Sequence, residues 1–87
     1  MNKRELEKYI KKCLSYDAYF TIDIRGKYVL FRLYGYDNRE VCLIEIPYKN
    51  RLDKEAIYTA IVDLINKFDF SFRVTFTSVK EIYDFLN

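Results

Sequence analysis

The spacing of apolar residues along this 87-residue chain predicts its secondary structure. Three segments repeat apolar residues every three or four positions, as a helix with one buried face does: 2–14, 53–68 and 78–86. Other segments alternate with the period of two of a β-strand: 19–25, 28–34, 41–46 and 70–76. The predicted element order is therefore α-β-β-β-α-β-α, and the length predicts a single domain over residues 1–87.

Turn and cap residues mark the ends of these segments. Glycine accepts a positive φ, so either Arg25-Gly26 or Gly26-Lys27 supplies the first hairpin turn. Both residues of Asp37-Asn38 tolerate the left-handed region, so this pair supplies the second turn. The predicted helix N-caps are Asn2, Asp53 and Ser78.

Strand pairing follows from these turns, because a slip by one residue would move every side chain to the opposite face. The second turn pairs Tyr34 with Val41, Leu33 with Cys42, Arg32 with Leu43 and Phe31 with Ile44. The first hairpin pairs Tyr19 with Arg32, Phe20 with Phe31 and Ile22 with Val29. A right-handed crossover through the second helix makes the fourth strand parallel to the third, and the simplest place for it is beside the first strand. We expect an α+β fold with a mixed four-stranded sheet in the order 4-1-2-3, two long helices on one face and a short C-terminal helix.

The strand at 28–34 is apolar or aromatic on both of its faces. Val29, Phe31 and Leu33 point one way, toward the predicted core. The opposite, outer face carries the residue types of contact surfaces, and its candidate interaction residues are Tyr19, Tyr28, Leu30, Arg32, Tyr34, Val41 and Leu43. A competing interpretation is that the C-terminal helix folds across this face and buries its apolar residues on Leu30 and Leu43.

Composition argues against catalysis. The chain has no His, the usual general base and metal ligand, and its acidic residues are scattered along the predicted elements. We therefore expect a protein that is not an enzyme and has no metal or other cofactor. Cys13 and Cys42 lack CxxC spacing and are predicted to be reduced core thiols, with a disulfide between them as the alternative. The sequence has no signal-peptide pattern and no membrane span, which predicts a cytoplasmic protein.

Basic residues raise the alternative of nucleic-acid binding, although the net charge is only +2. The candidate phosphate contacts are Arg25, Lys27, Lys49, Arg51 and Lys54. Residues 25–31, with Arg-Gly-Lys followed by alternating aromatics, resemble a strand of the RNA recognition motif, but that family begins with a strand where this chain begins with a helix. Lys54-Glu55-Ala56 and Ala60 resemble the second helix of double-stranded-RNA-binding domains, whose order is α-β-β-β-α. Asp53 departs from that pattern, because an acid there repels phosphates.

These observations favour a small interaction module that binds a protein partner, or a second copy of itself, through the Tyr/Leu/Arg face. In size and helix–sheet layout the chain is similar to anti-CRISPR and other counter-defence proteins, which implies a phage or mobile-element inhibitor of a host machine. The alternative function is nucleic-acid binding, either like double-stranded-RNA-binding domains or by stacking single-stranded bases on the tyrosines.

Overall fold

The computed structural model describes residues 3–13, 19–35, 38–67 and 74–87. Its elements follow the predicted order: α1 (Lys3–Cys13), β1 (Tyr19–Arg25), β2 (Tyr28–Tyr34), β3 (Glu40–Pro47), α2 (Arg51–Lys67), β4 (Val74–Phe76) and α3 (Val79–Leu86). The predicted cap Asn2, the turn residue Asp37 and the strand positions 70–73 lie outside the described residues. The α+β class, with a mixed four-stranded sheet, is confirmed.

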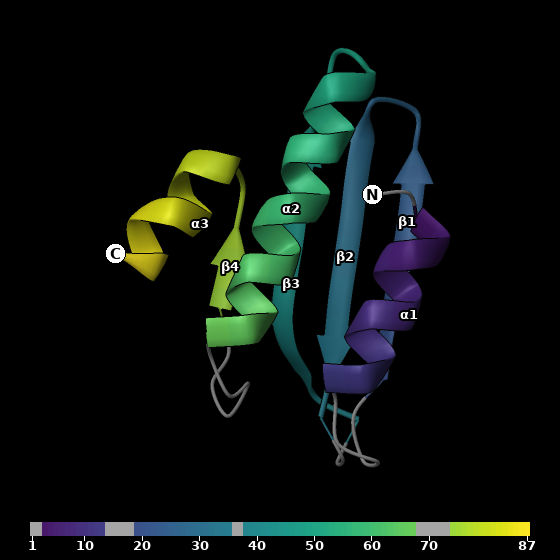
Figure 1. Ribbon diagram of the computed structural model, residues 1–87, viewed down its shortest axis with the longest axis vertical. Coiled ribbons are helices and arrows are strands. Elements are labelled where there is room, and N and C mark those ends of the chain that lie inside the picture. Colours follow the sequence, from purple (N-terminus) through teal and green to yellow (C-terminus); the bar gives the residue numbers. More distant parts are fainter. Residues whose placement is uncertain (1–2, 14–18, 36–37, 68–73) are drawn as a thin grey trace.

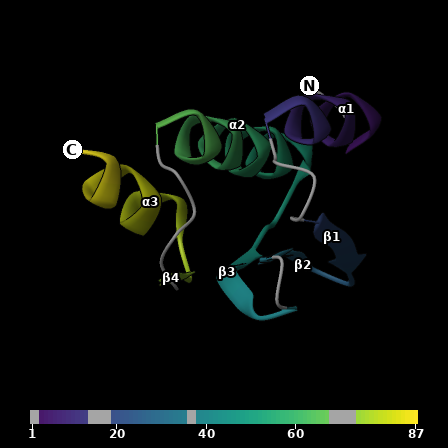
Figure 2. The same ribbon diagram turned by 90° about the horizontal axis from the view of Figure 1, so that it is seen from below.

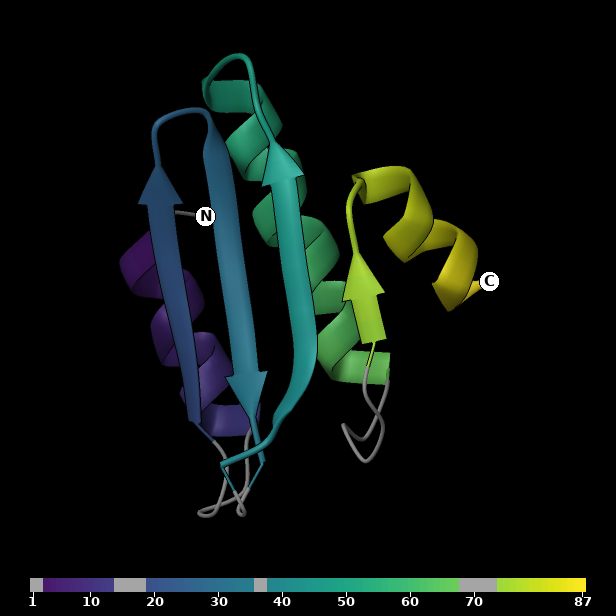
Figure 3. The ribbon, with the colours of Figure 1, turned by 180° about the vertical axis from the view of Figure 1, so that it is seen from behind.

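The molecule has two layers (Figures 1 and 2). The sheet forms one layer, and α1 and α2 lie side by side over one of its faces, as predicted. The short helix α3 lies at the β4 side of the molecule, where it contacts α2 and β4. The opposite face of the sheet, which we call the outer face, is turned away from the helices (Figure 3).

The strand order is β1-β2-β3-β4, so the predicted order 4-1-2-3 is wrong. β4 is parallel to β3, as predicted, but it pairs with β3 and not with β1. The reason lies in the helix layer, where α1 covers the β1 side of the sheet and α2 lies toward β3 (Figure 1). A chain leaving α2 reaches the open side of β3 by the shorter route, and β1 is left at the edge of the sheet.

The first hairpin is paired two residues away from the predicted register. Its turn is Gly26-Lys27, and Gly26 has φ +57°, as a type II′ turn requires at its first central position. The observed pairs are Tyr19 with Tyr34, Phe20 with Leu33 and Ile22 with Phe31. Because the shift is by an even number, every side chain keeps its predicted face.

The second hairpin confirms three predicted pairs and corrects the fourth. Leu33 pairs with Cys42, Arg32 with Leu43 and Phe31 with Ile44, but Tyr34 pairs with Glu40 and not with Val41. The register shifts here because the chain closes through a longer turn, in which the Gly35 N–H donates to the Arg39 carbonyl over 2.8 Å and Asn38 has φ +63°. Val41 is the extra residue of the resulting β-bulge.

The core lies between the helix layer and the inner face of the sheet. Fully buried side chains include Leu6 and Ile10 of α1, and the predicted inner residues of β2 and β3 meet them. Cys42 is buried and free, so the predicted reduced thiol is confirmed for this cysteine. Helix α2 buries seven residues, Tyr58 and Val62 among them, because it contacts both α1 and α3.

The N-cap of α2 is Asn50 and not Asp53. The Asn50 side-chain oxygen accepts from the N–H groups of Leu52 (2.9 Å) and Asp53 (3.2 Å). In return, the Asp53 carboxylate accepts from the N–H groups of Asn50 (3.2 Å) and Lys49 (2.7 Å). Asp53 therefore acts as the third residue of a reciprocal capping box, a role in which a carboxylate also suits the helix dipole.

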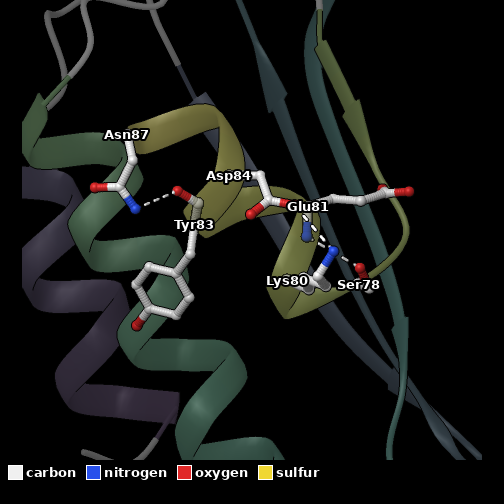
Figure 4. A network of polar contacts seen from close by, with 6 residues as sticks. All are labelled: Ser78, Lys80, Glu81, Tyr83, Asp84 and Asn87. Atoms are coloured by element: carbon white, nitrogen blue, oxygen red, sulfur yellow. Dashed lines mark hydrogen bonds and ion pairs between the residues drawn. The ribbon is translucent and has the colours of Figure 1, made fainter.

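Helix α3 begins at its predicted N-cap, Ser78 (Figure 4). The Ser78 hydroxyl accepts from the Glu81 N–H over 3.1 Å, and the Glu81 carboxylate accepts from the N–H of Thr77 over 2.7 Å. This backbone bond, together with the Thr77 hydroxyl, lowers the pKa of Glu81. At the other end, the Asn87 side chain and backbone N–H both donate to the Tyr83 carbonyl. Tyr83 also donates to Asp63 over 3.3 Å and so ties α3 to α2.

We expect Ser78→Ala to lower the free energy of unfolding by about 1 kcal/mol, because the Glu81 N–H then loses its partner. Urea unfolding followed by circular dichroism measures the change. Lys80→Ala is the matched control on the same turn, since its ion pair with Asp84 is exposed and contributes little. Equal losses in the two variants would contradict the capping role of Ser78.

Candidate interaction face of the sheet

No helix among the described residues crosses the outer face (Figure 3). The competing interpretation, in which the C-terminal helix buries Leu30 and Leu43, is wrong. Ile82 and Leu86 of α3 are buried in the main core, and Phe85 meets the inner-face residue Phe76 at a ring-centroid distance of 5.4 Å. The apolar side of α3 is therefore occupied at the β4 side of the core, and the part of the chain that the structure describes leaves the outer face open.

The structure brings six of the seven predicted interaction residues together on the outer face. β2 contributes Tyr28, Leu30, Arg32 and Tyr34, β1 contributes Tyr19, and β3 contributes Leu43. Val41 differs, because it is the extra residue of the bulge and packs against the buried core. The sequence pattern missed this because it assumed an unbroken alternation along β3.

The centre of the face is apolar. Leu43 lies opposite Arg32, and Leu30 lies opposite Glu45, so the two leucines are diagonal neighbours across β2 and β3. Both are half-buried. They form the middle of a surface that also carries the Arg32 side chain.

Tyrosines flank this centre at both ends. Tyr19 and Tyr34 are cross-strand partners, and their rings stack with centroids 4.8 Å apart and an interplanar angle of 16°. Tyr28 lies toward the opposite end of β2, and Tyr19 and Tyr28 are each 47% exposed. The Tyr19 and Tyr34 rings already stack on each other. A nucleic-acid base therefore cannot insert between them without separating the pair.

Acidic residues on this face were missed by the sequence analysis. The same alternation that selected the tyrosines places Asp23 and Glu45 there, and the bulge adds Glu40 opposite Tyr34. Arg32 Nε lies 3.8 Å from a Glu40 carboxylate oxygen, and Arg25 lies 3.7 Å from Asp23. Carboxylates therefore neutralise the positive charges of the two arginines on this face. As a result, the face offers little electrostatic attraction to a polyanion.

The predicted phosphate contacts, Arg25 among them, lie toward the end of the molecule that holds the β1–β2 turn and the start of α2 (Figure 1). Tyr48 joins these segments: its N–H donates to the Lys27 carbonyl over 2.8 Å, and its hydroxyl donates to the Gly26 carbonyl over 2.6 Å. The Lys54 ammonium lies 4.4 Å from the centroid of the Tyr48 ring. We call this group, which is Arg25, Lys27, Lys49, Arg51 and Lys54, the basic end.

An apolar groove of about 330 Å³ opens near the start of α3. Its floor combines residues from β3, α2 and α3, and its lining residues are Ile46, Pro47, Asp53, Ala56, Ile57, Thr77, Ser78 and Val79. It exists because β4 ends at Phe76, opposite Ile44, whereas β3 continues to Pro47. No sequence pattern could indicate it, since three separate elements line it.

Burial raises the pKa of two core groups, Cys42 and Tyr58, and of Tyr83 on α3. The pKa of the Cys42 thiol rises to about 12, and the nearby Glu40 carboxylate adds to the shift. The pKa values of Tyr58 and Tyr83 lie above the usual value for tyrosine. Over the described ranges, the side chains form no cluster of three or more acidic, His or Cys residues that could hold a metal ion.

The helices of the described chain are all too short or too polar to cross a membrane. Comparison with known proteins gives no relative from which to transfer a role: no family model, no curated protein and no solved structure matches this chain.

Proposed function

We propose that this protein is a non-enzymatic module that binds a protein partner through the outer face of its sheet. The observation that supports the proposal is the open apolar centre formed by Leu30 and Leu43, with no described helix over it. An apolar centre with Arg and Tyr around it has the composition of a protein-binding hot spot.

Charge distinguishes this proposal from base stacking on the same face. Asp23, Glu40 and Glu45 would lie against the phosphates of a bound single strand. A protein partner, by contrast, can pair with both signs of charge at the rim of the interface. A narrower form of this proposal names the class of partner. In it the protein is encoded by a phage or mobile element, and the partner is a host machine that the protein inhibits.

We expect Leu43→Arg to weaken binding of the partner by at least tenfold, because it places a charge in the apolar centre of the face. The measurement is affinity capture from cells of the organism that encodes the protein, with mass spectrometry. Leu52→Arg is the matched control, since Leu52 lies on α2 and is 77% exposed. Circular dichroism of each variant establishes that the fold is intact.

A protein captured by the wild type and by Leu52→Arg, but lost with Leu43→Arg, supports the proposal. Undiminished capture by a folded Leu43→Arg variant would contradict it.

Nucleic-acid binding is the second candidate, and the basic end is the observation that favours it. Here the Lys54 ammonium lies over the Tyr48 ring, and Tyr48 joins the β1–β2 turn, which contains Lys27, to the segment that carries Lys49 and Arg51. A labelled oligonucleotide that binds with a steep salt dependence, and is released by Lys49→Glu but not by Leu43→Arg, would establish this candidate in place of the first.

A further inference from the structure

The first strand, β1, is an unusually open edge of the sheet. It runs over Tyr19–Arg25, and among the described strands β2 is its one neighbour in the sheet. The other edge strand, β4, spans three described residues, whereas β1 presents seven. A long edge strand offers a row of unpaired N–H and C=O groups to another strand.

β1 lacks several of the usual protections of such an edge, although Asp23 and Arg25 on its outer side are charged. It contains no proline, and its antiparallel pairing with β2 is unbroken over its whole length. Its inward-facing residues, Phe20, Ile22 and Ile24, are all apolar, where protected edges often carry an inward charge. Ile24 is 39% exposed although it lies on the inner, apolar side of the strand. The edge is therefore suited to accept a further strand.

The hairpin turn determines which backbone groups are free. In a hairpin with a two-residue turn, the pair beside the turn exchanges both hydrogen bonds, and such pairs alternate along the ladder. Arg25 and Tyr28 flank the Gly26-Lys27 turn, so the odd-numbered residues of β1 bond to β2. The N–H and C=O groups of Phe20, Ile22 and Ile24 consequently point to the open edge.

We propose that β1 pairs with β1 of a second copy of this chain, antiparallel about a two-fold axis at Ile22. Ile22 then exchanges two hydrogen bonds with the Ile22 of the second copy, and Phe20 exchanges two with Ile24 in each direction. All seven residues of the strand are paired in this register. The product is a continuous sheet in which the helices of both copies lie on the same side.

Side-chain complementarity selects this register. On the inner side, each Ile24 meets Phe20 of the other copy, so an exposed apolar residue gains an apolar neighbour. On the outer side, Asp23 lies opposite Thr21, and Arg25 lies opposite the ring of Tyr19.

Registers with the two-fold axis one residue away from Ile22 are less favourable. A shift of the axis to Asp23 sets two aspartates opposite one another, which is destabilising. A shift to Thr21 leaves Ile24 and Arg25 unpaired. The self-pairing does not depend on the proposed function, because its contacts come from the β1 edge and not from Leu30 and Leu43.

Sedimentation equilibrium from micromolar to millimolar protein tests the proposal. We expect the mass to rise from 10.6 kDa to that of two chains. Ile24→Lys should weaken the dimer on the order of a hundredfold, since it adds an inward charge from each copy at the seam. Ile24→Val is the conservative control and should stay dimeric. Leu43→Arg should also stay dimeric, which separates this test from that of the proposed function.

Amide hydrogen exchange provides a readout specific to the register. The amides of Thr21 and Asp23 should be protected at all concentrations, whereas those of Phe20, Ile22 and Ile24 should become protected only on dimerisation. A chain that stays monomeric at millimolar concentration would overturn the proposal. A dimer that survives Ile24→Lys, or that leaves these three amides unprotected, would overturn it as well.

Discussion

Replacement of Phe31 by alanine is expected to lower the free energy of unfolding by about 3–5 kcal/mol. Phe31 is fully buried at the centre of the sheet, where it pairs with Ile22 on one side and Ile44 on the other. Its ring also stacks on Phe20 at a centroid distance of 5.9 Å. The truncation removes a large apolar area and leaves a cavity that two neighbouring strands cannot close. A loss of this size is a large part of the stability of a domain of this length.

Urea denaturation followed by circular dichroism measures this loss. Leu52→Ala is the control, because Leu52 is 77% exposed and its truncation should change the free energy by less than about 0.5 kcal/mol. Phe31→Leu keeps most of the buried volume and should fall between the two. A Phe31→Ala variant as stable as Leu52→Ala would contradict the placement of Phe31 in the core.

The second large effect is a loss of stability in alkali that depends on Cys42. Burial raises the pKa of this thiol from 9.0 to about 12 in the folded chain. Above pH 9 the unfolded chain releases the thiol proton and the folded chain keeps it, so the unfolded state binds fewer protons and stability falls as pH rises. The expected slope is about 1.4 kcal/mol per pH unit up to the folded pKa. Below pH 9 both states hold the proton, and Cys42 contributes no pH dependence.

The measurement compares urea unfolding of Cys13→Ala with that of Cys13→Ala/Cys42→Ala between pH 8 and 11. The difference in stability between the two proteins should be constant to pH 9 and then shift by about 2–3 kcal/mol by pH 11. The raised pKa of Tyr58 acts in the same direction, but it is common to both proteins and cancels. A thiol reagent should modify Cys42 slowly when the chain is folded and rapidly in denaturant. Parallel pH curves for the two proteins would contradict the buried, protonated thiol.

The position of α3 is what makes the outer face available. The apolar residues of this helix suited either face of the sheet when read from the sequence, and contact with α2 and β4 decided between them. Because Ile82 and Leu86 complete the core beside α2, Leu30 and Leu43 remain uncovered by the described helices. The proposed function follows from this choice of face.

Local sequence patterns predicted the elements and most strand faces correctly. They failed where the structure depends on contacts between distant parts of the chain. The alternation over 28–34 identified the inner and outer residues of β2, since that strand pairs regularly except at its last residue. The bulge at Val41 broke the same rule in β3, because the closing turn is longer than two residues. Asn50 was missed as the N-cap of α2 because Asp53, three residues later, is also a residue type that caps helices.

By itself, the sequence determined the order of the elements, the N-cap of α3 and the faces of the β1 and β2 residues, because these depend on neighbours a few positions away. Only the tertiary structure decided that β4 lies beside β3, that β1 is an open edge and that α3 packs beside α2. The physical reason is that several placements of β4 and α3 bury similar apolar surface, and competition for space over one face of the sheet selects among them. The candidate interaction face and the self-pairing edge both result from that selection.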